Sequence, residues 1–339
     1  MKIGILAFSE QGLLLGERLE GYFLTKAEEM DVTRCKDGGL TAWAQAHFAS
    51  DEALIFIGST GIAVRAIAPY LKSKAIDPAV IVVDELGTYS ISLLSGHLGG
   101  ANELAAEIAG VLGAIPVVTT ATDLHSVFAV DTWAKKQGLT IINPERIKWV
   151  SSRLLAGETL TLNSEFPVAG EPPRGIKLSE DKGDILVTCR TSGGAEALRL
   201  VPPIVTLGIG CKKDTDVETI EAVFSLMLGK AGCPPAAVKQ VCSIDLKANE
   251  PGILEFCRRR ALPYRTFSAA ALAAVPGKFT SSAFVKRVTG VDNICERSAV
   301  LGSGKGGRLL MQKYAADGVA MALAIAPYVL RFCGEGTTQ

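Results

Sequence analysis

Short apolar runs alternate with segments of helical spacing along the first third of the chain, and no other feature of the sequence restricts the fold as strongly. Lys2–Phe8, Ala53–Ile57 and Ala79–Val83 are compact runs rich in Val, Ile and Leu, as expected of buried strands. Gln11–Leu19 and Gly99–Leu112 carry apolar residues at helical spacing. Further strand-like runs are Tyr89–Leu94 and Ile115–Val118. This alternation predicts an open, mostly parallel sheet covered by helices.

The last third of the chain shows the same alternation. Ile204–Ile209 and Val241–Leu246 are predicted strands. Between them, four apolar residues share one face of a predicted helix: Val217, Ile220, Phe224 and Met227. Leu309–Tyr314 and Val319–Ile325 are expected to form a hairpin that turns at Asp317–Gly318. The C-terminal part is therefore predicted to be a second α/β domain.

The middle of the chain, from Asn143 to Val201, has less clear periodicity and several prolines and glycines. Ile185–Cys189 is a strand-like run within it, and the Pro202–Pro203 pair marks a boundary. The predicted fold is thus α/β and multi-domain, with mostly parallel sheets and flanking helices in its outer domains. The predicted domains are residues 1–142, a small central domain or connector at 143–201, and residues 202–339.

Composition excludes two classes of protein. Lys plus Arg and Asp plus Glu number 35 each, so the basic excess typical of a nucleic-acid binder is missing. The longest apolar stretch, Val319–Leu330, is interrupted by Pro327 and is shorter than the roughly 18 residues that a membrane span needs. Met1–Phe8 is interpreted as a first strand and not as a signal peptide. We therefore expect no membrane association.

The eight cysteines form no C-x-x-C pair, so the sequence predicts neither a zinc site nor a disulfide framework. Scattered, unpaired thiols in a chain of 339 residues fit a reducing cytoplasm. Most of these cysteines are expected to be small buried apolar side chains.

Three polar clusters follow predicted strands of the N-terminal domain: Gly58–Arg65, Asp84–Gly87 and Ser95–Asn102. Ligands of open α/β sheets bind at the carboxyl ends of the strands. We therefore expect the three clusters to converge at one edge of the sheet and to form a site there.

Ser95–Asn102 is the most informative cluster, because His97 lies among glycines just before a predicted helix. Glycines allow backbone amides to approach a ligand closely, and the start of a helix favours negative charge. An imidazole titrates near neutral pH and can move protons. A histidine that only hydrogen-bonds the turn is an equally acceptable interpretation.

The other two clusters have a functional and a structural interpretation. Hydroxyls, amides and Arg65 at Gly58–Arg65 suit a carboxylate or phosphate, although Thr60 would serve equally as a helix cap. Asp84 and Glu85 could include a general base with a raised pKa, and taken alone they are better explained as a capping pair.

Two glycine-rich stretches in the C-terminal part fail as nucleotide fingerprints. Gly208-Ile209-Gly210 lacks the third glycine, because Lys213 occupies that position, and a tight strand-to-helix turn is the favoured interpretation. Gly302–Gly307 lacks the Ser or Thr that would hold magnesium, and a loop is favoured. Carboxylates could be held in this part by Lys213, Asp245, Lys247, Thr280, Ser281 and Arg297, with salt bridges and caps as the alternative.

Nearly the whole chain resembles one family, the cobalt-precorrin-5A hydrolases. The segments that carry the resemblance are Ile57–Pro69, Val82–Gly87, Ser92–Asn102, Asn143–Glu158 with Arg146, Lys148 and Trp149, Gly208–Lys213, Ser243–Lys247 and Thr280–Gly290. The resemblance implies a cobalt-bound, ring-contracted tetrapyrrole substrate with a δ-lactone on its ring A acetate. Water would open the lactone, and a two-carbon fragment would leave as acetaldehyde.

This implied reaction gives each candidate residue an expected role. His97 is expected to be the base or proton shuttle, oriented by Glu85 or Asp84, while amides around Gly96–Gly100 stabilise the oxyanion. Residues expected to contact the substrate are Gly58, Ser59, Thr60, Gly61, Arg65, Ser95, Gly96, Gly99, Gly100, Asn102, Lys213, Asp245, Lys247, Thr280, Ser281 and Arg297.

The same resemblance sets expectations for cofactors and partners. No cofactor or metal of the protein's own is expected, because the substrate carries the cobalt. Expected partners are this small corrinoid, with other corrin-pathway enzymes and a second copy of the chain as further candidates. Two alternatives stay open: a non-catalytic corrinoid carrier of the same pathway, and a nucleotide-dependent enzyme that uses the glycine turns.

Overall fold

The computed structural model describes residues 1–24, 29–35, 39–73, 76–97, 99–120, 127–192 and 196–332. Leu98 and Cys333, which belong to predicted features, lie outside these residues. The chain forms two compact units: residues 1–135 with 151–158, and residues 136–150 with 159–339. The predicted domain limits stay a prediction. Within the described ranges, no helix has the length and apolar character needed to span a membrane.

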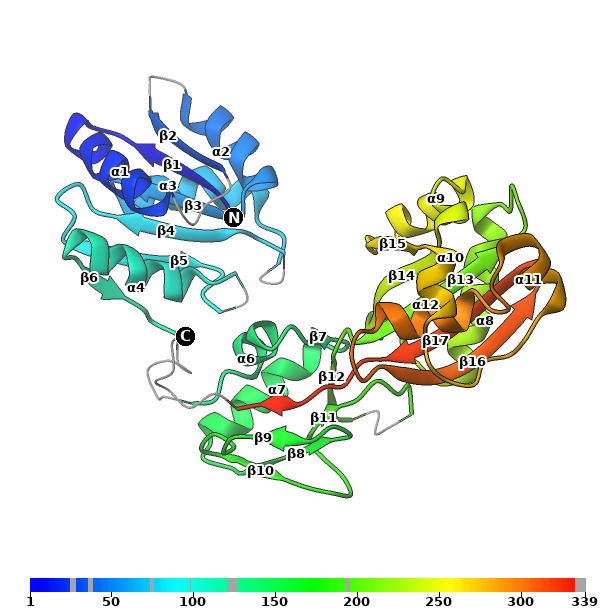
Figure 1. The fold of residues 1–339 in the computed structure, drawn as a ribbon. Coiled ribbons are helices and arrows are strands. Elements are labelled where there is room, and N and C mark those ends of the chain that lie inside the picture. Colours follow the sequence, from blue (N-terminus) through cyan, green and yellow to red (C-terminus); the bar gives the residue numbers. More distant parts are fainter. Residues whose placement is uncertain are drawn as a thin grey trace. The chain divides into compact units, whose positions relative to one another are not determined.

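The first unit contains a six-stranded sheet in the order β2-β1-β3-β4-β5-β6 (Figure 1). Its strands are β1 (Lys2–Ala7), β2 (Glu29–Arg34), β3 (Ala53–Ile57), β4 (Ala79–Val83), β5 (Tyr89–Leu94) and β6 (Ile115–Val117). The first four run parallel, β5 runs antiparallel to β4, and β6 runs parallel to β5. The predicted mostly parallel sheet is confirmed.

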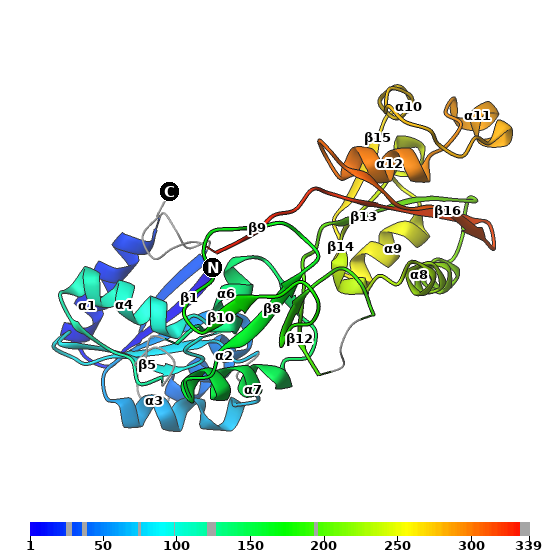
Figure 2. The same ribbon diagram turned by 90° about the horizontal axis from the view of Figure 1, so that it is seen from below.

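Helices cover both faces of this sheet (Figure 2). They are α1 (Glu10–Phe23), α2 (Gly39–Ser50), α3 (Thr60–Ile67) with the 3-10 turn Ala68–Tyr70, and α4 (Ala101–Leu112). Alternate strand residues point to opposite faces. Accordingly, Ile5, Ile55 and Ile81 pack with α1 and α4, whereas Phe56 and Val82 pack with α2 and α3. Strands β1, β3 and β4 are therefore apolar on both sides, which explains their unbroken apolar sequences.

A second sheet, in the order β10-β8-β11-β12-β7, lies in the central part of the chain. Its elements are β7 (Thr140–Ile141), β8 (Leu160–Ser164), β10 (Ile176–Leu178), β11 (Ile185–Val187) and β12 (Leu198–Val201), with helices α6 (Val130–Lys136) and α7 (Glu145–Leu155) nearby in sequence. Separately, β9 (Val168–Ala169) pairs with β18 (Leu330–Arg331). Leu330 and Phe332 are both buried, so this late segment of the chain is packed into the central region.

The third sheet, in the order β15-β14-β13-β17-β16, forms the C-terminal part. Its strands are β13 (Val205–Cys211), β14 (Val238–Ile244), β15 (Tyr264–Phe267), β16 (Arg308–Ala316) and β17 (Val319–Ile325). Strands β13 to β15 run parallel, and β17 runs antiparallel to β13. The predicted hairpin turn is confirmed, because Asp317 and Gly318 have φ angles of 51° and 81°.

Five helices accompany this sheet: α8 (Val217–Ala231), α9 (Pro251–Arg259), α10 (Ala269–Ala273), α11 (Ala283–Thr289) and α12 (Cys295–Gly302). Phe224 of α8 and Phe256 of α9 lie edge to face in the core, with ring centroids 5.1 Å apart. Ser282 caps α11 by accepting from the Val285 amide. This cap fixes the start of α11 at Ala283.

Two local predictions for this part are wrong. Gly208–Gly210 lies inside β13 and forms no turn; a Cβ at Gly208 would come within 1.8 Å of the Cys295 carbonyl oxygen, so the glycine allows α12 to pack directly on the strand. Strand β14 ends at Ile244, and Asp245–Lys247 is a 3-10 turn. The strand predicted at Val241–Leu246 therefore ends two residues earlier, and Asp245 and Lys247 lie in the turn that follows it.

Candidate functional sites

The reversal of β5 separates the polar clusters of the first unit. Val83, at the carboxyl end of β4, pairs with Ser90 near the start of β5, whereas Leu94 pairs with Val80. Ser95–Asn102 therefore lies at the edge opposite Gly58–Arg65 and Asp84–Gly87, across a five-residue strand about 16 Å long. The predicted convergence of the three clusters is wrong. So is the predicted orientation of His97 by Glu85 or Asp84.

At the carboxyl edge of β3 and β4, the structure favours a turn-forming role for Asp84. Its carboxylate accepts from the Leu86 amide at 3.2 Å and from the Tyr89 amide, which closes the link between β4 and β5. Glu85 is exposed. Ser59 begins α3 without a side-chain cap, and Arg65 donates to the Gly61 carbonyl at 3.4 Å. Anion binding by Ser59, Thr60, Gly61 and Arg65 beside Gly58 stays a prediction.

At the opposite edge, Ser95–His97 and Gly99–Asn102 belong to a tight and partly strained turn, here called the His97 loop. Ser95 has a φ of 57°, and its hydroxyl donates to the Asp77 carbonyl at 2.9 Å. A Cβ at Gly96 would lie 2.6 Å from Asn102 Oδ1, and one at Gly99 would lie 2.3 Å from the Ser95 Cβ. A left-handed non-glycine residue costs on the order of 1–3 kcal/mol, and such strain clusters at functional sites.

His97 has a carboxylate neighbour that the sequence analysis did not identify. Its Nδ1 lies 3.9 Å from Asp131 Oδ2, and the two side chains are 19% and 8% exposed. The other Asp131 oxygen accepts from the Thr132 amide at 3.0 Å. Asp131 is 34 positions away in sequence, so no local motif connects it to His97. The only feature of the sequence that marks Asp131 is its position as an acidic residue in the first turn of the short helix α6.

Asn102 fixes the end of the His97 loop. Its Oδ1 accepts from the Ser92 hydroxyl at 2.6 Å, and its Nδ2 donates to Thr120 Oγ1 at 3.0 Å. Three backbone amides of the loop also donate within it, those of Gly100, Ala101 and Asn102. Gly96 and Gly99 have no such backbone bond within the described residues, so their amides are the donors available to a ligand.

A cavity of about 750 Å³ lies in the second unit, at the carboxyl edge of β13 and β14. It is referred to below as the C-terminal cavity. Residues after β13, after β14, in α11, in the loop before α12 and in the β16–β17 hairpin line it. Pockets of roughly 300–1,000 Å³ are typical small-molecule sites. This cavity therefore has the size and the topological position of a ligand site.

Four lysines line the C-terminal cavity: Lys212, Lys213, Lys247 and Lys313. Lys247 Nζ lies 2.6 Å from Glu250 Oε2. Among the described residues, no carboxylate lies within 4.0 Å of the other three ammonium groups. Three large apolar side chains line the same cavity although each is more than half exposed: Leu246, Phe284 and Val288. The cavity thus combines free positive charge with an uncovered apolar wall.

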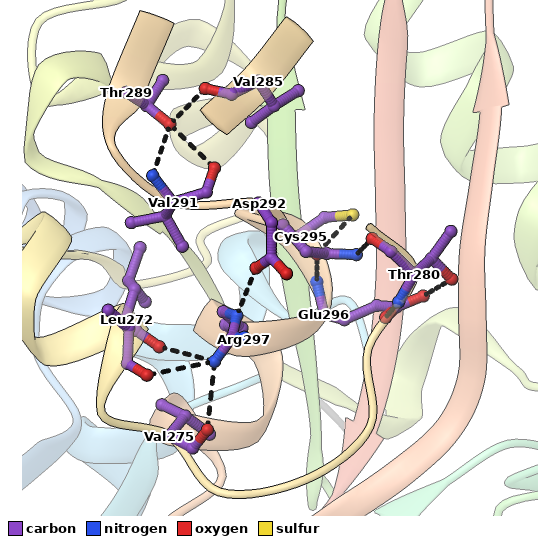
Figure 3. Close-up of polar contacts among 12 residues, drawn as sticks. Leu272, Val275, Thr280, Val285, Thr289, Val291, Asp292, Cys295, Glu296 and Arg297 are labelled. Atoms are coloured by element: carbon purple, nitrogen blue, oxygen red, sulfur yellow. Dashed lines mark hydrogen bonds and ion pairs between the residues drawn. The ribbon is translucent and has the colours of Figure 1, made fainter. Parts of the chain in front are cut away.

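Of the predicted binding residues in this unit, Lys213 and Lys247 line the cavity, whereas Asp245, Thr280, Ser281 and Arg297 do not. Figure 3 shows how Arg297 is engaged. It donates to Asp292 Oδ1 at 3.0 Å and to the carbonyls of Leu272, Ala273 and Val275. These contacts hold the end of α10 and give Arg297 a structural role in place of the predicted clamp.

Thr280 does not line the cavity, but it contacts residues that hold the cavity wall in place. Its amide and hydroxyl donate to the carboxylate of Glu296, which is 1% exposed (Figure 3). The same carboxylate accepts from the Lys313 amide at 2.7 Å. Asn293 donates to the Thr280 carbonyl at 2.8 Å. Glu296 thus connects the α11 region to β16. Its role could not be predicted, because a buried carboxylate has no sequence signature.

Most of the described cysteines are buried, as predicted for small apolar side chains. Five of the described cysteines are buried: Cys189, Cys233, Cys242, Cys257 and Cys295. Burial raises the pKa of Cys211, and it raises the pKa of Cys295 to about 12. Both line the cavity and are therefore neutral thiols at pH 7. The described ranges contain no group of three His, Cys, Asp or Glu side chains arranged to hold a metal ion.

Glu250 is expected to make stability depend on pH. Burial alone would raise its pKa, but hydrogen bonds from Lys247 and the Asp214 amide, with the charge of Lys213, hold the pKa below 4.5. A carboxylate with a lowered pKa stabilises the fold above its ordinary pKa, and this contribution is lost as pH falls through the lowered value. Glu250→Gln should therefore reduce the free energy of unfolding by about 1.5–3 kcal/mol at pH 7.

Urea unfolding of wild type and Glu250→Gln between pH 7 and pH 3 tests this expectation. The difference between the two proteins should be constant above about pH 5 and should shrink below pH 4.5, the ordinary pKa of the group. A difference that is the same at pH 3 and pH 7 would contradict it.

The chain is similar to known proteins in both sequence and fold. Three family profiles match in order: "Cobalamin synthesis G N-terminal" at residues 42–123, "Cobalamin biosynthesis central region" at 128–202 and "Cobalamin synthesis G C-terminus" at 205–324. A protein of Salmonella typhimurium called cobalt-precorrin-5A hydrolase is 36% identical over 305 residues, with 86% of each chain covered. A protein of the same name from Priestia megaterium is 30% identical, covering 96% of this chain and 95% of the relative.

Among solved structures, a cobalamin biosynthesis protein G homologue from Sulfolobus solfataricus is 23% identical, with a TM-score of 0.43 and 96% of this chain and 97% of that chain covered.

Proposed function

The chain belongs to the cobalamin biosynthesis G family, and from this premise we propose that it is a hydrolase that acts on cobalt-precorrin-5A. The observation that carries the proposal is the 36% identity to a cobalt-precorrin-5A hydrolase over 86% of both chains. The likeness extends through the N-terminal, central and C-terminal family profiles. The proposal therefore concerns the whole chain and does not depend on a single motif.

The proposed reaction has two steps. Water adds to the carbonyl of the ring A acetate δ-lactone, and the acyl–oxygen bond breaks, which leaves a carboxylate on the ring and a hydroxyl on the two-carbon fragment. Loss of the hydroxyl proton then drives cleavage of the carbon–carbon bond to the ring. The fragment leaves as acetaldehyde, and the electron pair of the broken bond stays with the macrocycle and its cobalt, where a proton is taken up. The product is cobalt-precorrin-5B.

Two groups of the His97 loop have the chemistry for the first step. The His97 imidazole would accept a proton from the attacking water, and the Asp131 carboxylate, 3.9 Å from Nδ1, would stabilise the imidazolium that forms. The amides of Gly96 and Gly99 would donate to the oxyanion, each donor being worth about 3 kcal/mol in such a site. Asp131 replaces Glu85 and Asp84 in this role because it lies at the same edge of the sheet as His97.

The substrate supplies the remaining chemistry. A conjugated ring that carries cobalt can accept the electron pair, so we propose that the protein uses no cofactor of its own. The acetate and propionate arms make the substrate a polyanion. Other enzymes of the corrin pathway and a second copy of the chain are proposed as further partners, and the cytoplasm as the compartment, in keeping with seven free cysteines among the described residues.

The test is incubation with cobalt-precorrin-5A under anaerobic conditions in ¹⁸O-labelled water, with trapping of volatile aldehyde. We expect one acetaldehyde per corrinoid and one ¹⁸O atom in the new carboxylate. Tight binding of the corrinoid without aldehyde would replace the proposal with the carrier alternative. Calorimetry with ATP and NAD addresses the nucleotide alternative, and the incomplete glycine fingerprints predict no binding of either.

A further inference from the structure

The C-terminal cavity presents two chemically different walls. The lysines come from the strand ends and the hairpin, whereas Phe284 and Val288 come from one short helix, α11. We infer that this cavity binds a flat macrocycle through its carboxylate arms, and that Glu250 is a positioning residue which fixes the lysines that recognise those arms. The identification of the natural ligand as a corrinoid rests on the proposed function. The charge and the apolar wall of the cavity are observed independently of that function.

The balance of charge favours an anionic ligand. Four lysines and two aspartates, Asp292 and Asp317, line the cavity. Asp292 is neutralised by Arg297, whose Nε lies 3.0 Å from its carboxylate. Positive charge that faces a cavity without a counter-ion is stabilised when a carboxylate binds. Several such charges spread over one cavity fit a ligand with several carboxylate arms.

The apolar wall favours a flat, conjugated ligand over a sugar phosphate or a free dicarboxylic acid. Phe284 is 66% exposed, Val288 is 61% exposed and Leu246 is 67% exposed. Large apolar side chains that are left open to water around one cavity mark a binding surface. A tetrapyrrole ring would cover them with its face while its acidic arms reach the lysines.

Glu250 connects the two segments that carry three of the lysines. It is 7% exposed; its Oε1 accepts from the Asp214 amide at 2.6 Å, and its Oε2 lies 2.6 Å from Lys247 Nζ. Asp214 directly follows Lys212 and Lys213 and has a left-handed φ of 58°. Glu250 therefore holds the segment after β13 and the turn after β14 at a fixed separation. It does not line the cavity, so its effect on a ligand must act through the lysines.

The packing of α9 reinforces this connection. A Cβ at Gly252, two residues after Glu250, would lie 2.1 Å from the Thr215 carbonyl oxygen. The start of α9 is thus in direct contact with the segment that carries Lys212 and Lys213. A change at Glu250 should alter the placement of these lysines without removing any of their charges.

The experiment uses the full-length protein and uroporphyrin III, a flat tetrapyrrole with eight carboxylate arms, with binding followed by porphyrin fluorescence at several salt concentrations. Lys213→Met and Lys313→Met should each weaken binding about 10-fold and should lower the dependence of log Kd on log salt. Lys239→Met is the matched control, because Lys239 is exposed at the other end of β14 and lies outside the cavity. It should leave both quantities unchanged.

Glu250→Gln should weaken uroporphyrin binding about 3- to 10-fold although it removes a negative charge, and Glu250→Asp should recover part of the loss. The control is Glu255→Gln on α9, the helix that Glu250 directly precedes, because Glu255 pairs with Arg258 and Arg259 away from the cavity. A simple gain of positive charge in Glu250→Gln would strengthen binding instead. Stronger or unchanged binding would therefore overturn the positioning role.

The outcomes separate this inference from the proposed function. If Lys213→Met and Lys313→Met release acetaldehyde with an unchanged KM and bind uroporphyrin as wild type does, the inference fails while the proposed reaction stands. Equal weakening by Lys239→Met would also overturn it, since the binding would then reflect net charge alone. If wild type releases no acetaldehyde but the cavity variants lose porphyrin binding, the inference holds and the proposed reaction fails.

Discussion

His97→Ala should lower the rate of acetaldehyde release at least about 100-fold, because general acid–base groups contribute roughly 10²- to 10⁴-fold to such reactions. The fold should be retained, since hydrogen bonds of the Ser95 and Asn102 side chains hold the His97 loop. Binding of cobalt-precorrin-5A should change little, so the loss should appear in kcat. The measurement is a single-turnover assay with trapped aldehyde.

Another histidine of the same unit provides the control. His47 lies 2.6 Å from Asp51 and stacks on Trp43, with ring centroids 4.3 Å apart. His47→Ala should lower the stability of the first unit but not the rate per folded molecule. Asp131→Asn should give an intermediate loss together with a changed pH profile. Wild-type turnover by His97→Ala would exclude the imidazole from the chemistry.

Gly208→Ala is expected to destabilise the second unit by about 3 kcal/mol or more, at the upper end of the usual cost of overpacking a core. The added Cβ would lie 1.8 Å from the Cys295 carbonyl oxygen and 2.8 Å from the Ala299 nitrogen. Both are backbone atoms of α12 or its start, so the helix would have to move away from β13 as a whole. Chemical unfolding with a probe in the second unit would measure the loss.

Gly210→Ala is the matched control, because it lies two residues further along the same strand and so points to the same face. Its added Cβ would meet nothing closer than 3.9 Å, at Ile294. The stability of Gly210→Ala should therefore remain within about 1 kcal/mol of wild type. An equal loss of stability in both variants would contradict this prediction. Glycine would then be required in β13 for a reason other than the close contact with α12.

Much of the fold could be predicted because several strands, among them β1, β3 and β4, are buried on both faces. Ala79–Val83 and Tyr89–Leu94 were predicted to the residue, and so was the β16–β17 turn, since positive φ angles favour an Asp-Gly pair. Strand β2 was missed. It lies at one edge of its sheet and pairs only with β1. Its Glu, Asp and Arg residues are accepted there because an edge strand is less buried than a central one.

The site was harder to predict because it depends on strand direction. Only five residues, Asp84–Thr88, connect β4 to β5, whereas a parallel crossover needs a dozen or more. The short loop therefore indicates that β5 runs antiparallel to β4, which places His97 at the edge of the sheet opposite Asp84 and Glu85. The pairing of His97 with Asp131, and of Glu250 with the Asp214 amide, had no comparable signal, because side chains distant in sequence meet only after packing.

The pairing of β9 with β18 has a consequence for the order of events during synthesis. Val168 leaves the ribosome long before its partner Leu330, which follows about 160 positions later, and contacts of such sequence separation form slowly. The nascent central region must therefore wait with one strand unpaired until the hairpin of the C-terminal sheet has been translated. Ribosome stalling between the two strands should prolong this interval.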